Sequence, residues 1–471
     1  MSIKKILLVN PPQTLEERYG KAFSKIGALL PPIGLMYIAA MLEEKGYEAR
    51  IVDTQLKNLN IEQAAEECTR IKPDLIGISC MTSNFAKSLA LCSKLKEKMD
   101  VPIMIGGPHA TIAPEDILKN KYVDFVVRGE GEDSTAELAN ALNSGKIKSL
   151  YSIEGIGFKD NGKIVLTKQR TLMKDIDMLP FPARHLVKLK EYRPSPPHYK
   201  RLPTTTMLTS RGCPYGCTFC SNPIWGRSHR QRSVENVIKE IKYLIREYGI
   251  RDINFWDDIF GINKKWLYEF CDAIKKEKID ITWHCEFRAN LADKETLKRM
   301  ADAGCWAIFY GFESMDQEIL DAINKMITPE QIRNAIKWTK DAGIEVRANF
   351  ILGLPNETPA KARKMVRELT KMNPDYVKFN ILTPYPSTEL YNQISSGRWG
   401  EMTGEFNKLT GYFPTFRPLG YKNLGEVQKM RQWAYRKYYL RPGFILYKLS
   451  RIKSYDDLVR HIRGAMAILS L

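Results

Sequence analysis

Three cysteines within a short stretch constrain this 471-residue chain more than any other feature. Cys213, Cys217 and Cys220 stand in the sequence CPYGCTFC. Thiolates at short, fixed spacing in a loop with glycine and proline can close around one inorganic centre, and four such ligands complete a zinc or iron–sulfur site. Only three are present here, and the next cysteine, Cys271, lies far along the chain. Three thiolates on a four-iron cluster leave one iron open, and an open iron can bind and reduce a substrate.

The residues around the cysteines carry a resemblance to a known family. Arg211 and Gly212 precede the first cysteine, and the aromatic Phe219 stands inside the last gap. The stretch resembles the cluster-binding loop of radical S-adenosylmethionine (SAM) enzymes. That resemblance implies that the three cysteines are catalytic and hold a [4Fe–4S] cluster. The alternative is a structural zinc knuckle, with His229 as its fourth ligand.

Composition and cysteine usage bound the class of protein. Lysine and arginine number 72 against 54 acidic residues, for a formal charge of +18 at pH 7. A basic balance favours an acidic partner or serves solubility alone, and no nucleic-acid motif accompanies it, so we expect no nucleic-acid partner. The nine cysteines are scattered apart from the one cluster, which is not a disulfide framework. We therefore expect a reducing, cytoplasmic location.

The sequence predicts neither a secretory signal nor a membrane span. The N-terminal stretch MSIKKILLVN has four apolar residues after its lysines, which is too few for a signal core. The longest apolar run, residues 26–42, is broken by Pro31 and Pro32 and falls short of a bilayer span. It predicts a loop that leads into a buried helix. Peripheral contact with a membrane surface stays open.

The first 150 residues alternate short apolar runs with amphipathic segments. The chain is long enough for two or three domains, since one domain usually takes roughly 100–200 residues. The apolar runs predict strands at residues 6–9, 49–52, 75–78, 103–105 and 125–127. The amphipathic segments predict helices at residues 36–45, 61–70, 85–98, 114–120 and 134–142. This alternation indicates an α/β fold with a doubly wound parallel sheet, which binds ligands beyond the carboxyl ends of its strands.

The residues at these strand ends favour close approach of a large flat ligand. Glycine pairs such as Gly106-Gly107 let the backbone come near such a ligand. A dinucleotide is disfavoured, because the first turn lacks the G-x-G-x-x-G fingerprint. The stretches GGPHAT and RGEGE resemble those of the Rossmann-like cobalamin-binding domain found in front of many radical SAM enzymes. The cobalamin-binding positions that this resemblance implies are Asn10, Pro11, Pro12, Ser79, Thr82, Gly106, Gly107, His109, Glu130, Gly131 and Glu132.

The domain departs from many cobalamin proteins in one respect. Those proteins often carry D-x-H-x-x-G after the first strand, with a histidine that ligates cobalt from below, and no such motif is present here. The resemblance then implies that cobalamin binds with its own base displaced and without that histidine. His109 is the only histidine of residues 1–150. We favour a loop-fixing hydrogen bond for His109 over ligation of cobalt.

A weaker pattern over residues 151–198 predicts a linker. Residues 153–158 and 163–166 predict a hairpin around the turn Asp160-Asn161-Gly162. Prolines at 180 and 182, and then Pro194, Pro196 and Pro197, punctuate a crossover between domains. We therefore expect a cobalamin-binding domain at 1–150, the linker at 151–198, a barrel at 199–400 and a helical substrate-binding or capping tail at 401–471.

Strand–helix alternation resumes after the linker. Candidate strands are residues 206–209, 252–256, 282–286, 307–311, 345–351 and 376–382. Helices fall between them, for example at residues 233–248 and 264–276. Six such units agree with the partial (β/α)6 barrel of the radical SAM family, and the ends of parallel strands are where such folds place their chemistry.

The family resemblance extends along the ends of these strands. A W-D-D-x-F stretch ends the second strand, where G-G-E is more common in the family, and it implies a site for the amino group of SAM. Arg288 would meet the SAM carboxylate and Glu313 the ribose hydroxyls. The SAM-binding positions implied are Phe219, Trp256, Asp257, Asp258, Arg288, Glu313, Ser314, Leu352, Gly353 and Leu354. The alternatives are that Asp257, Asp258 and Glu313 cap helices and that Arg288 forms a structural ion pair.

The last seventy or so residues change in character. Residues 430–439, MRQWAYRKYY, interleave basic and aromatic side chains, and amphipathic helices follow. Such a face could bind a substrate, a membrane surface or a phosphate-rich ligand. We favour a helical cap that closes the open side of the barrel over a membrane anchor.

The resemblance implies a cobalamin-dependent radical SAM C-methyltransferase. Its cofactors would be a [4Fe–4S] cluster, SAM and cobalamin. Reductive cleavage of SAM would give a 5′-deoxyadenosyl radical, hydrogen would be abstracted from an unactivated carbon, and methylcobalamin would supply the methyl group. Partners would be a small-molecule, lipid or peptide substrate and an electron donor such as ferredoxin or flavodoxin. The alternatives are a cobalamin-dependent radical SAM cyclase without net methylation, such as the chlorophyll-pathway cyclase, and a non-catalytic cobalamin sensor.

Overall fold

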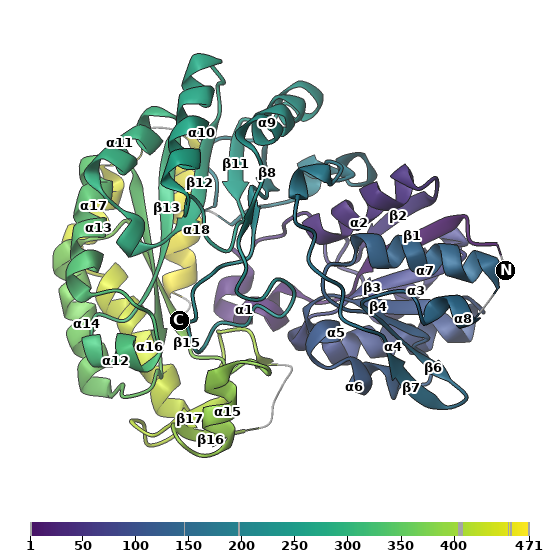
Figure 1. Ribbon diagram of the computed structural model, residues 1–471. Helices are drawn as coiled ribbons and strands as arrows, with labels where there is room; N and C mark the ends of the chain where they lie inside the picture. The colour runs from purple at the N-terminus through teal and green to yellow at the C-terminus, as the bar shows by residue number, and fades with distance from the viewer. Residues whose placement is uncertain are drawn as a thin grey trace. The chain divides into compact units, whose positions relative to one another are not determined.

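Two parallel sheets organise the chain, one in each of two structural units (Figure 1). The computed structural model describes residues 2–145, 147–195, 198–403, 408–450, 452 and 455–469. Pro196 and Pro197 of the predicted crossover lie outside the described residues. Unit 1 contains Met1–Thr14, Leu29–Tyr192 and Asn222–Arg230. Unit 2 contains Leu15–Ala28, Arg193–Ser221 and Gln231–Leu471.

In the described residues, unit 1 is built on a seven-stranded sheet with the order β2-β1-β3-β4-β5-β6-β7. Its strands are β1 (Lys5–Asn10), β2 (Glu48–Asp53), β3 (Leu75–Ser79), β4 (Ile103–Gly106), β5 (Phe125–Val127), β6 (Ile156–Asp160) and β7 (Lys163–Leu166). The first five are parallel, and β6 and β7 are antiparallel additions at one edge. The winding direction reverses between β1 and β3, and ligands bind open α/β sheets at such a switch point.

The predicted doubly wound fold of residues 1–150 is confirmed, and its five strands agree with the prediction to within one residue at each end. The helices are α2 (Ile33–Glu44), α3 (Ile61–Ile71), α4 (Phe85–Lys98), α5 (Pro108–Ile112), α6 (Pro114–Leu118), α7 (Glu132–Ser144) and α8 (Ile147–Leu150). The helix expected at residues 114–120 is α6, and α5 precedes it because Pro114 begins a new first turn. The hairpin of β6 and β7 turns at Asn161 and Gly162, both at positive φ, and it extends the sheet of unit 1.

Unit 2 holds a six-stranded, all-parallel sheet in its described part, with the order β15-β14-β13-β12-β11-β8. Its strands are β8 (Thr204–Met207), β11 (Asp252–Phe255), β12 (Thr282–Phe287), β13 (Cys305–Glu313), β14 (Glu345–Leu352) and β15 (Tyr376–Ile381). All six predicted strands are present. β13 extends further at both ends than predicted. Its pairing with β12 and its pairing with β14 each contain a register shift.

Helices alternate with the strands of this open barrel (Figure 1). They are α9 (Val234–Tyr248), α10 (Lys264–Lys276), α11 (Lys294–Asp302), α12 (Gln317–Ala322), α13 (Pro329–Asp341), α14 (Pro359–Met372) and α15 (Glu389–Ser395). Their first residues follow from local capping. The side chain of Ser233 accepts a hydrogen bond from the backbone of Asn236 at the start of α9, and Gly249 ends that helix in the left-handed conformation. The remaining short strands are β9 (Ser210–Arg211), β10 (Arg230–Gln231), β16 (Gly400–Met402) and β17 (Phe416–Pro418).

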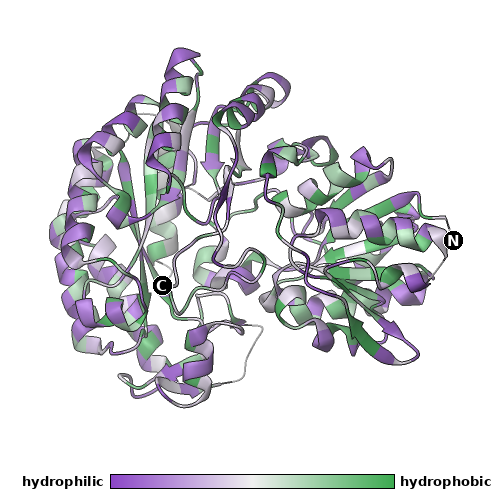
Figure 2. Cartoon of the chain, in the orientation of Figure 1, coloured by the Kyte–Doolittle hydropathy of each residue, from purple (hydrophilic) through white to green (hydrophobic). Residues whose placement is uncertain are grey.

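The two faces of the barrel sheet differ in chemistry. Alternate residues of a strand point to opposite faces. The outer face packs against helices and contains large buried side chains, namely Phe255, Trp283, Tyr310, Phe350 and Phe379. Figure 2 shows the strands of both sheets as largely hydrophobic beneath helices of mixed character. Burial of this apolar face is the main driving force for the fold of the unit.

The opposite face of the barrel sheet, called the inner face below, carries polar side chains. They alternate in sequence with the buried residues of the outer face: Asn254, Glu286, Asn349, Lys378 and Asn380. A parallel sheet buried on both faces usually reads as a continuous hydrophobic run. The polar inner face therefore indicates a surface kept for binding.

The C-terminal helices are α16 (Leu424–Tyr439), α17 (Pro442–Leu449) and α18 (Tyr455–Leu469). α16 covers β15, the edge strand of the barrel. The hydroxyl of Tyr439 accepts from the backbone nitrogen of Val377 and donates to its carbonyl oxygen, both at 2.8 Å, and the Tyr435 hydroxyl accepts from the nitrogen of Phe379 at 3.2 Å. These tyrosines occupy backbone groups that an edge strand would otherwise leave unpaired. α1 (Leu15–Ser24) belongs to unit 2 as well, where Phe23 packs on Tyr435. No helix among the described residues is long and apolar enough to cross a bilayer.

Tyr439→Phe is expected to lower the free energy of unfolding by about 1–3 kcal/mol, because it leaves both backbone groups of Val377 without a partner. Urea denaturation followed by tryptophan fluorescence measures this loss. Tyr391→Phe is the matched control, since the Tyr391 hydroxyl makes no hydrogen bond with any described residue. Equal stability of the two variants would contradict the role given to α16.

Candidate functional site

The cysteine loop follows β8 and β9 and is held by its backbone to distant parts of unit 2. The nitrogen of Thr218 donates to the carbonyl of Ile323 at 3.0 Å, and the carbonyl of Thr218 accepts from the nitrogen of Leu390 at 2.9 Å. The amide of Asn324 donates to the carbonyl of Gly216 at 2.9 Å. The loop therefore rests between the C-terminal end of α12 and the first turn of α15, beside the carboxyl ends of the barrel strands.

The thiols of this loop are the accessible ones of the chain. Cys213 and Cys217 are half-buried and Cys220 is exposed. Burial raises the pKa of the Cys213 thiol, and the neighbouring Asp258 carboxylate and Cys217 raise it further, while Arg288 opposes them. In the described part of the chain, no three Cys, His, Asp or Glu side chains are arranged closely enough to hold a metal ion. The donor set fits an iron–sulfur cluster by its chemistry and common loop, and iron would replace the thiol protons on binding.

Arg288 lies against the cysteine loop. Its Nη1 donates to the Cys217 Sγ at 3.8 Å, and its guanidinium stacks 3.7 Å from the centroid of the Tyr215 ring. Its Nη2 donates to the carbonyl oxygen of Lys325, and its Nε donates to the side chain of Asn290 at 3.0 Å. Among the described residues Arg288 forms hydrogen bonds and a cation–π contact and no ion pair, so the structure gives the alternative of a structural ion pair no support. Contact between Arg288 and the SAM carboxylate stays a prediction.

Glu313 ends β13 in an uncommon backbone conformation. Its φ is 65°, which is uncommon for a residue with a side chain, and the β13–β14 register shifts at this point. Its carboxylate pairs with Lys325 at 2.9 Å, and both side chains are buried. A Cβ on Gly311 would lie 2.5 Å from the Glu313 Oε1, so glycine makes room for the pair. The Lys325 ammonium also lies 5.7 Å from the centroid of the Phe219 ring.

Asp257 fixes the backbone that leads into the cysteine loop. Its Oδ1 accepts from the backbone nitrogens of Thr209 and Ser210 at 2.7 and 2.8 Å, and its Oδ2 accepts from the Thr209 hydroxyl at 2.5 Å. Burial raises the pKa of Asp257 to about 7, although those hydrogen bonds act to lower it. The side chain that caps the next helix, α10, is Asn263, so the alternative of helix capping by Asp257 or Asp258 is wrong.

The remaining predicted SAM positions lie at the same strand ends. Trp256 and Asp258 are exposed there, and Ser314 is buried with its hydroxyl accepting from the nitrogen of Asp316 at 3.1 Å. Asp316 caps α12, which makes the capping alternative for Glu313 wrong as well. Direct contact of Trp256, Asp258 and Ser314 with SAM stays a prediction.

The stretch Leu352, Gly353 and Leu354 turns sharply after β14. Gly353 has a φ of 86°, and its nitrogen donates to the Glu357 Oε1 at 2.6 Å. The same oxygen accepts from the Tyr421 hydroxyl at 2.7 Å. Burial raises the pKa of Glu357 to about 7, with these hydrogen bonds opposing the rise. Glu357 therefore holds the backbone that the family resemblance assigns to adenine.

Sequence reasoning missed three residues that shape this site. Tyr215 lies under Arg288, Lys325 pairs with Glu313, and Glu357 fixes Gly353. Lys325 and Glu357 are charged residues buried against partners elsewhere in the sequence, and no spacing pattern marks them. Tyr215 stands inside the cysteine loop, and its place between Cys213 and Cys217 was the one available signal.

In unit 1, the predicted positions at the end of β1 lie at the switch point of the sheet. The Asn10 side chain donates to Asp53 at 2.9 Å, and Gln55 donates to the Asn10 Oδ1 at 3.2 Å and to the Pro11 carbonyl at 3.1 Å. Asp53 also accepts from the Tyr192 hydroxyl at 3.0 Å, and burial raises its pKa. Pro11 and Pro12 are buried. This network fixes the backbone that leaves β1.

His109 and Gly107 form the other side of the switch point. The His109 Nδ1 lies 3.2 Å from the Thr82 hydroxyl, which agrees with a loop-fixing hydrogen bond, and burial lowers the pKa of the ring. Its Nε2 is buried and has no partner among the described residues. Gly107 has a φ of 104°, and a Cβ there would lie 2.9 Å from the carbonyl oxygen of Cys80. An orphaned ring nitrogen beside a backbone that admits no side chain fits a large planar ligand such as cobalamin.

The other predicted cobalamin positions surround this point. Ser79 and Gly106 end the neighbouring strands β3 and β4, where they pair in register. Glu130 accepts from the backbone nitrogen of Met173 at 3.1 Å and from Arg230 at 2.8 Å, all within unit 1. Gly131 and Glu132 follow, and Glu132 is buried at the start of α7. Glu130 is thus engaged with protein groups, and ligand contact at these positions stays a prediction.

Gly107→Ala is expected to weaken cobalamin binding about tenfold or more, because the new Cβ would strike the Cys80 carbonyl and move the turn at the switch point. Gel filtration followed by corrin absorbance measures the bound cobalamin. Gly46→Ala is the matched control: Gly46 also has a positive φ, 84°, but nothing lies within 4 Å of its Cβ position. The assignment fails if both variants retain cobalamin equally.

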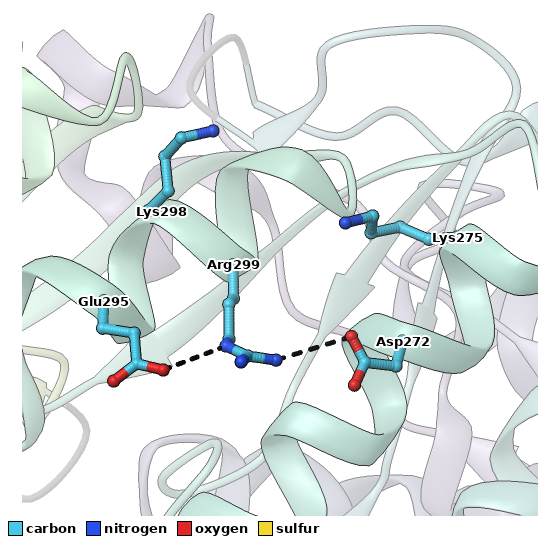
Figure 3. Close-up of a pocket in the computed structure, with 5 residues that line it drawn as sticks. All are labelled: Asp272, Lys275, Glu295, Lys298 and Arg299. Atoms are coloured by element: carbon cyan, nitrogen blue, oxygen red, sulfur yellow. Dashed lines mark hydrogen bonds and ion pairs between the residues drawn. The ribbon is translucent and has the colours of Figure 1, made fainter.

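Two surface pockets lie outside this set of residues. One, of 340 Å³, lies on α10 and α11, where Arg299 bridges Glu295 at 3.3 Å and Asp272 at 3.6 Å (Figure 3). All its lining side chains are charged, and none of them is a predicted site residue. The other, of 510 Å³, is lined by polar residues around α12 and α15 and includes Thr218 of the cysteine loop. It marks the outer side of that loop.

Two family models match the chain. The B12 binding domain matches residues 21–139, and the radical SAM superfamily matches residues 207–391. A protein of Pyrococcus horikoshii named "Uncharacterized methyltransferase" is 33% identical over 99% of each chain. The anaerobic magnesium-protoporphyrin IX monomethyl ester cyclase of Rubrivivax gelatinosus is 28% identical over 95% of this chain and 80% of its own. The hopanoid C-3 methylase of Methylococcus capsulatus is 27% identical over 88% of this chain and 78% of its own.

Solved structures share the fold. The radical SAM methyltransferase TsrM from Kitasatospora setae, with cobalamin and a [4Fe–4S] cluster bound, aligns with a TM-score of 0.72 over 100% of this chain and 99% of its own, at 17% identity. The cobalamin-dependent SAM radical enzyme OxsB aligns with a TM-score of 0.71 over 99% of this chain and 72% of its own, at 18% identity. The chain therefore belongs to the radical SAM enzymes that carry a B12-binding domain, a family with methyltransferase members, and its cofactors are a [4Fe–4S] cluster, SAM and cobalamin.

Proposed function

We propose that this protein methylates an unactivated carbon of its substrate in a radical reaction. When bound, the cluster supplies one electron that cleaves SAM to methionine and a 5′-deoxyadenosyl radical, and cobalamin supplies the methyl group. The residues of the chain bind and orient these groups and exclude water from the radical. The methyltransferases among the relatives support this proposal.

One observation carries the proposal: the loop holds all the accessible thiols of the chain. The other six cysteines are buried. They are Cys68, Cys80, Cys92, Cys271, Cys285 and Cys305. The described residues therefore offer no fourth accessible thiolate, and a cluster on three ligands keeps one iron open for SAM. In the zinc alternative His229 would be the fourth ligand, and metal analysis distinguishes the two, since zinc would replace iron.

We assign positioning roles to the charged residues beside the loop. A hydrogen bond from Arg288 to the Cys217 sulfur stabilises negative charge on a cluster ligand, which is one means by which proteins set cluster potentials. The Lys325 ammonium holds the Glu313 carboxylate near Phe219, where the family resemblance places SAM. Asp257 fixes the backbone of Thr209 and Ser210, and through it the approach to the loop.

Product analysis tests the proposal without knowledge of the substrate. Reconstituted protein is incubated anaerobically with SAM, cobalamin and a strong chemical reductant. We expect slow release of 5′-deoxyadenosine and about one S-adenosylhomocysteine per bound cobalamin, since transfer of one methyl group from SAM to the bound carrier would leave that product. Release of 5′-deoxyadenosine without S-adenosylhomocysteine would favour the cyclase alternative, which the cyclase relatives keep open. Absence of both products would favour the sensor alternative.

We further propose a reducing cytoplasmic location, an electron donor such as ferredoxin or flavodoxin, and the four-part organisation at 1–150, 151–198, 199–400 and 401–471. All nine cysteines are free, which suits a reducing compartment. The hairpin within 151–198 extends the sheet of unit 1, so a linker that begins after the hairpin suits the contacts better. Expression of residues 193–471 tests this division: the product lacks α1 of unit 2 but keeps the barrel sheet and the cysteine loop, and it should still bind iron.

A further inference from the structure

Lys378 places a positive charge on the inner face of the barrel sheet. It lies in the middle of β15, in register with Asn349 of β14. Its neighbours Val377 and Phe379 are 2% and 0% exposed and belong to the hydrophobic cluster of the outer face. Lys378 therefore points to the opposite side, where its side chain is exposed.

No carboxylate of the described residues forms an ion pair with Lys378. Its ammonium group interacts with phenols instead. It lies 5.1 Å from the centroid of the Tyr412 ring. Its charge also acts on Tyr385, whose pKa is raised by burial and lowered by Lys378. A lysine whose neighbours are hydroxyl groups keeps its full charge available to a ligand.

Glu286 is an acidic residue on this face, and the charge of Lys378 acts on it. Burial raises the pKa of Glu286 to about 8, and the Lys378 and Lys325 charges oppose that rise. Glu286 forms no ion pair with Lys378 in the described part of the chain, so no carboxylate contacts the Lys378 ammonium there.

Other polar groups of the inner face also lack partners. The Nδ2 of Asn254 and both ring nitrogens of His284 are buried and make no hydrogen bond within the described parts of the chain. Buried polar groups in folded proteins are nearly always satisfied, by protein, water or ligand. Their presence on the same face as Lys378 indicates that a polar molecule or water occupies this surface.

We propose that Lys378 binds a carboxylate or phosphate group of the substrate, so that the methyl acceptor is a polar, anionic molecule rather than a hydrocarbon. This inference rests on the proposed function. Anions bind where a cation and hydroxyl or amide donors converge, and charge-assisted hydrogen bonds of this kind are the strong ones. Tyr412 supplies a hydroxyl, and the amides of Asn349 and Asn380 are the neighbouring groups on the same face. An apolar acceptor would leave the Lys378 charge desolvated and unpaired.

Chemical labelling of lysines tests the proposal on the cofactor-loaded protein with inorganic probes. Lysines are reductively methylated with SAM saturating throughout, so the SAM carboxylate cannot account for any difference. Rates at Lys378 and at Lys337 are compared in inorganic phosphate, acetate and chloride at equal ionic strength. At a probe concentration twice its dissociation constant, the free fraction is about one third, so labelling of Lys378 falls about threefold. Lys337 lies on the outer surface and pairs with Asp341, so its rate should not change.

Variants provide a second readout that is independent of labelling. Phosphate or acetate should raise the melting temperature of the wild type and of Lys378→Arg, which keeps the cation, more than that of Lys378→Gln. Lys337→Gln should respond as the wild type does. Protection by phosphate alone assigns a phosphoryl group, and protection by both probes assigns any carboxylate or phosphate. Equal labelling of Lys378 in all three salts, or equal protection of Lys337, overturns the proposal. Product analysis with SAM is a separate experiment from lysine labelling. A failure of the proposed methyl transfer would appear as missing S-adenosylhomocysteine, whereas a failure of the anion site would appear as unchanged labelling of Lys378.

Discussion

Replacement of Cys217 with alanine is expected to lower 5′-deoxyadenosine formation by at least about 1,000-fold, because SAM cleavage has no pathway without the cluster. The two cysteine thiolates that remain do not hold a four-iron cluster. Bound iron and the broad absorbance of the cluster should therefore fall together with activity. Cys213→Ala and Cys220→Ala should behave in the same way. The measurements are iron per chain and product formation after anaerobic reconstitution.

The matched control for the loop variants is Cys68→Ala. Cys68 is buried in α3 of unit 1 and belongs to its hydrophobic cluster, so it is not accessible to a cluster. That variant should keep its iron and its activity per folded molecule, at a modest cost in stability from the lost side chain. If Cys217→Ala keeps its iron while Cys68→Ala loses it, the assignment of the loop is wrong.

Lys325→Met is expected to lower the free energy of unfolding of unit 2 by about 3–5 kcal/mol. The substitution leaves the Glu313 carboxylate buried and without its 2.9 Å partner, and an uncompensated buried charge is costly. The double variant Lys325→Met with Glu313→Gln removes both charges and should recover much of that loss. Urea denaturation followed by tryptophan fluorescence is suited to the measurement, because every tryptophan except Trp225 lies in unit 2.

Two further variants separate the buried pair from general effects. Lys337→Met breaks an exposed pair with Asp341, and exposed pairs contribute about 0–1 kcal/mol. Gly311→Ala pushes a Cβ to 2.5 Å from the Glu313 Oε1 and should weaken SAM binding, whereas Gly443→Ala meets nothing within 4 Å. If Lys325→Met costs no more than Lys337→Met, the pair does not hold the end of β13.

The fold followed from the sequence because its signals are local. Apolar runs bounded by glycine, proline and polar residues placed β1 to β5 to within one residue. Each barrel strand was also recovered, although the register shifts of β13 lengthened it beyond its apolar run. The loop cysteines were singled out by their spacing and by the flanking residues that carry the family resemblance, and their role as cluster ligands stays a prediction. These features depend on neighbours in the chain, and a sequence displays them directly.

The parts that sequence reasoning missed depend on contacts between distant segments. α1 joins unit 2 through Phe23 and Tyr435, which are separated by most of the chain. Lys325 and Glu357 became visible only as partners of Glu313 and Gly353. Contact between Asp257 and SAM stays a prediction, and the three hydrogen bonds that its oxygens accept from Thr209 and Ser210 could not be seen from spacing. Side-chain partners of this kind are set by the tertiary fold and not by spacing.

The most direct test of the account is electron paramagnetic resonance of the reduced, reconstituted protein with and without SAM. The account requires a four-iron cluster on three thiolates whose remaining iron binds SAM. Addition of SAM should therefore change the g values of the reduced cluster, and the change should disappear together with the signal in Cys217→Ala. A four-iron signal that SAM leaves unchanged, under conditions where SAM binding is shown independently, would contradict the open iron on which the proposed chemistry depends.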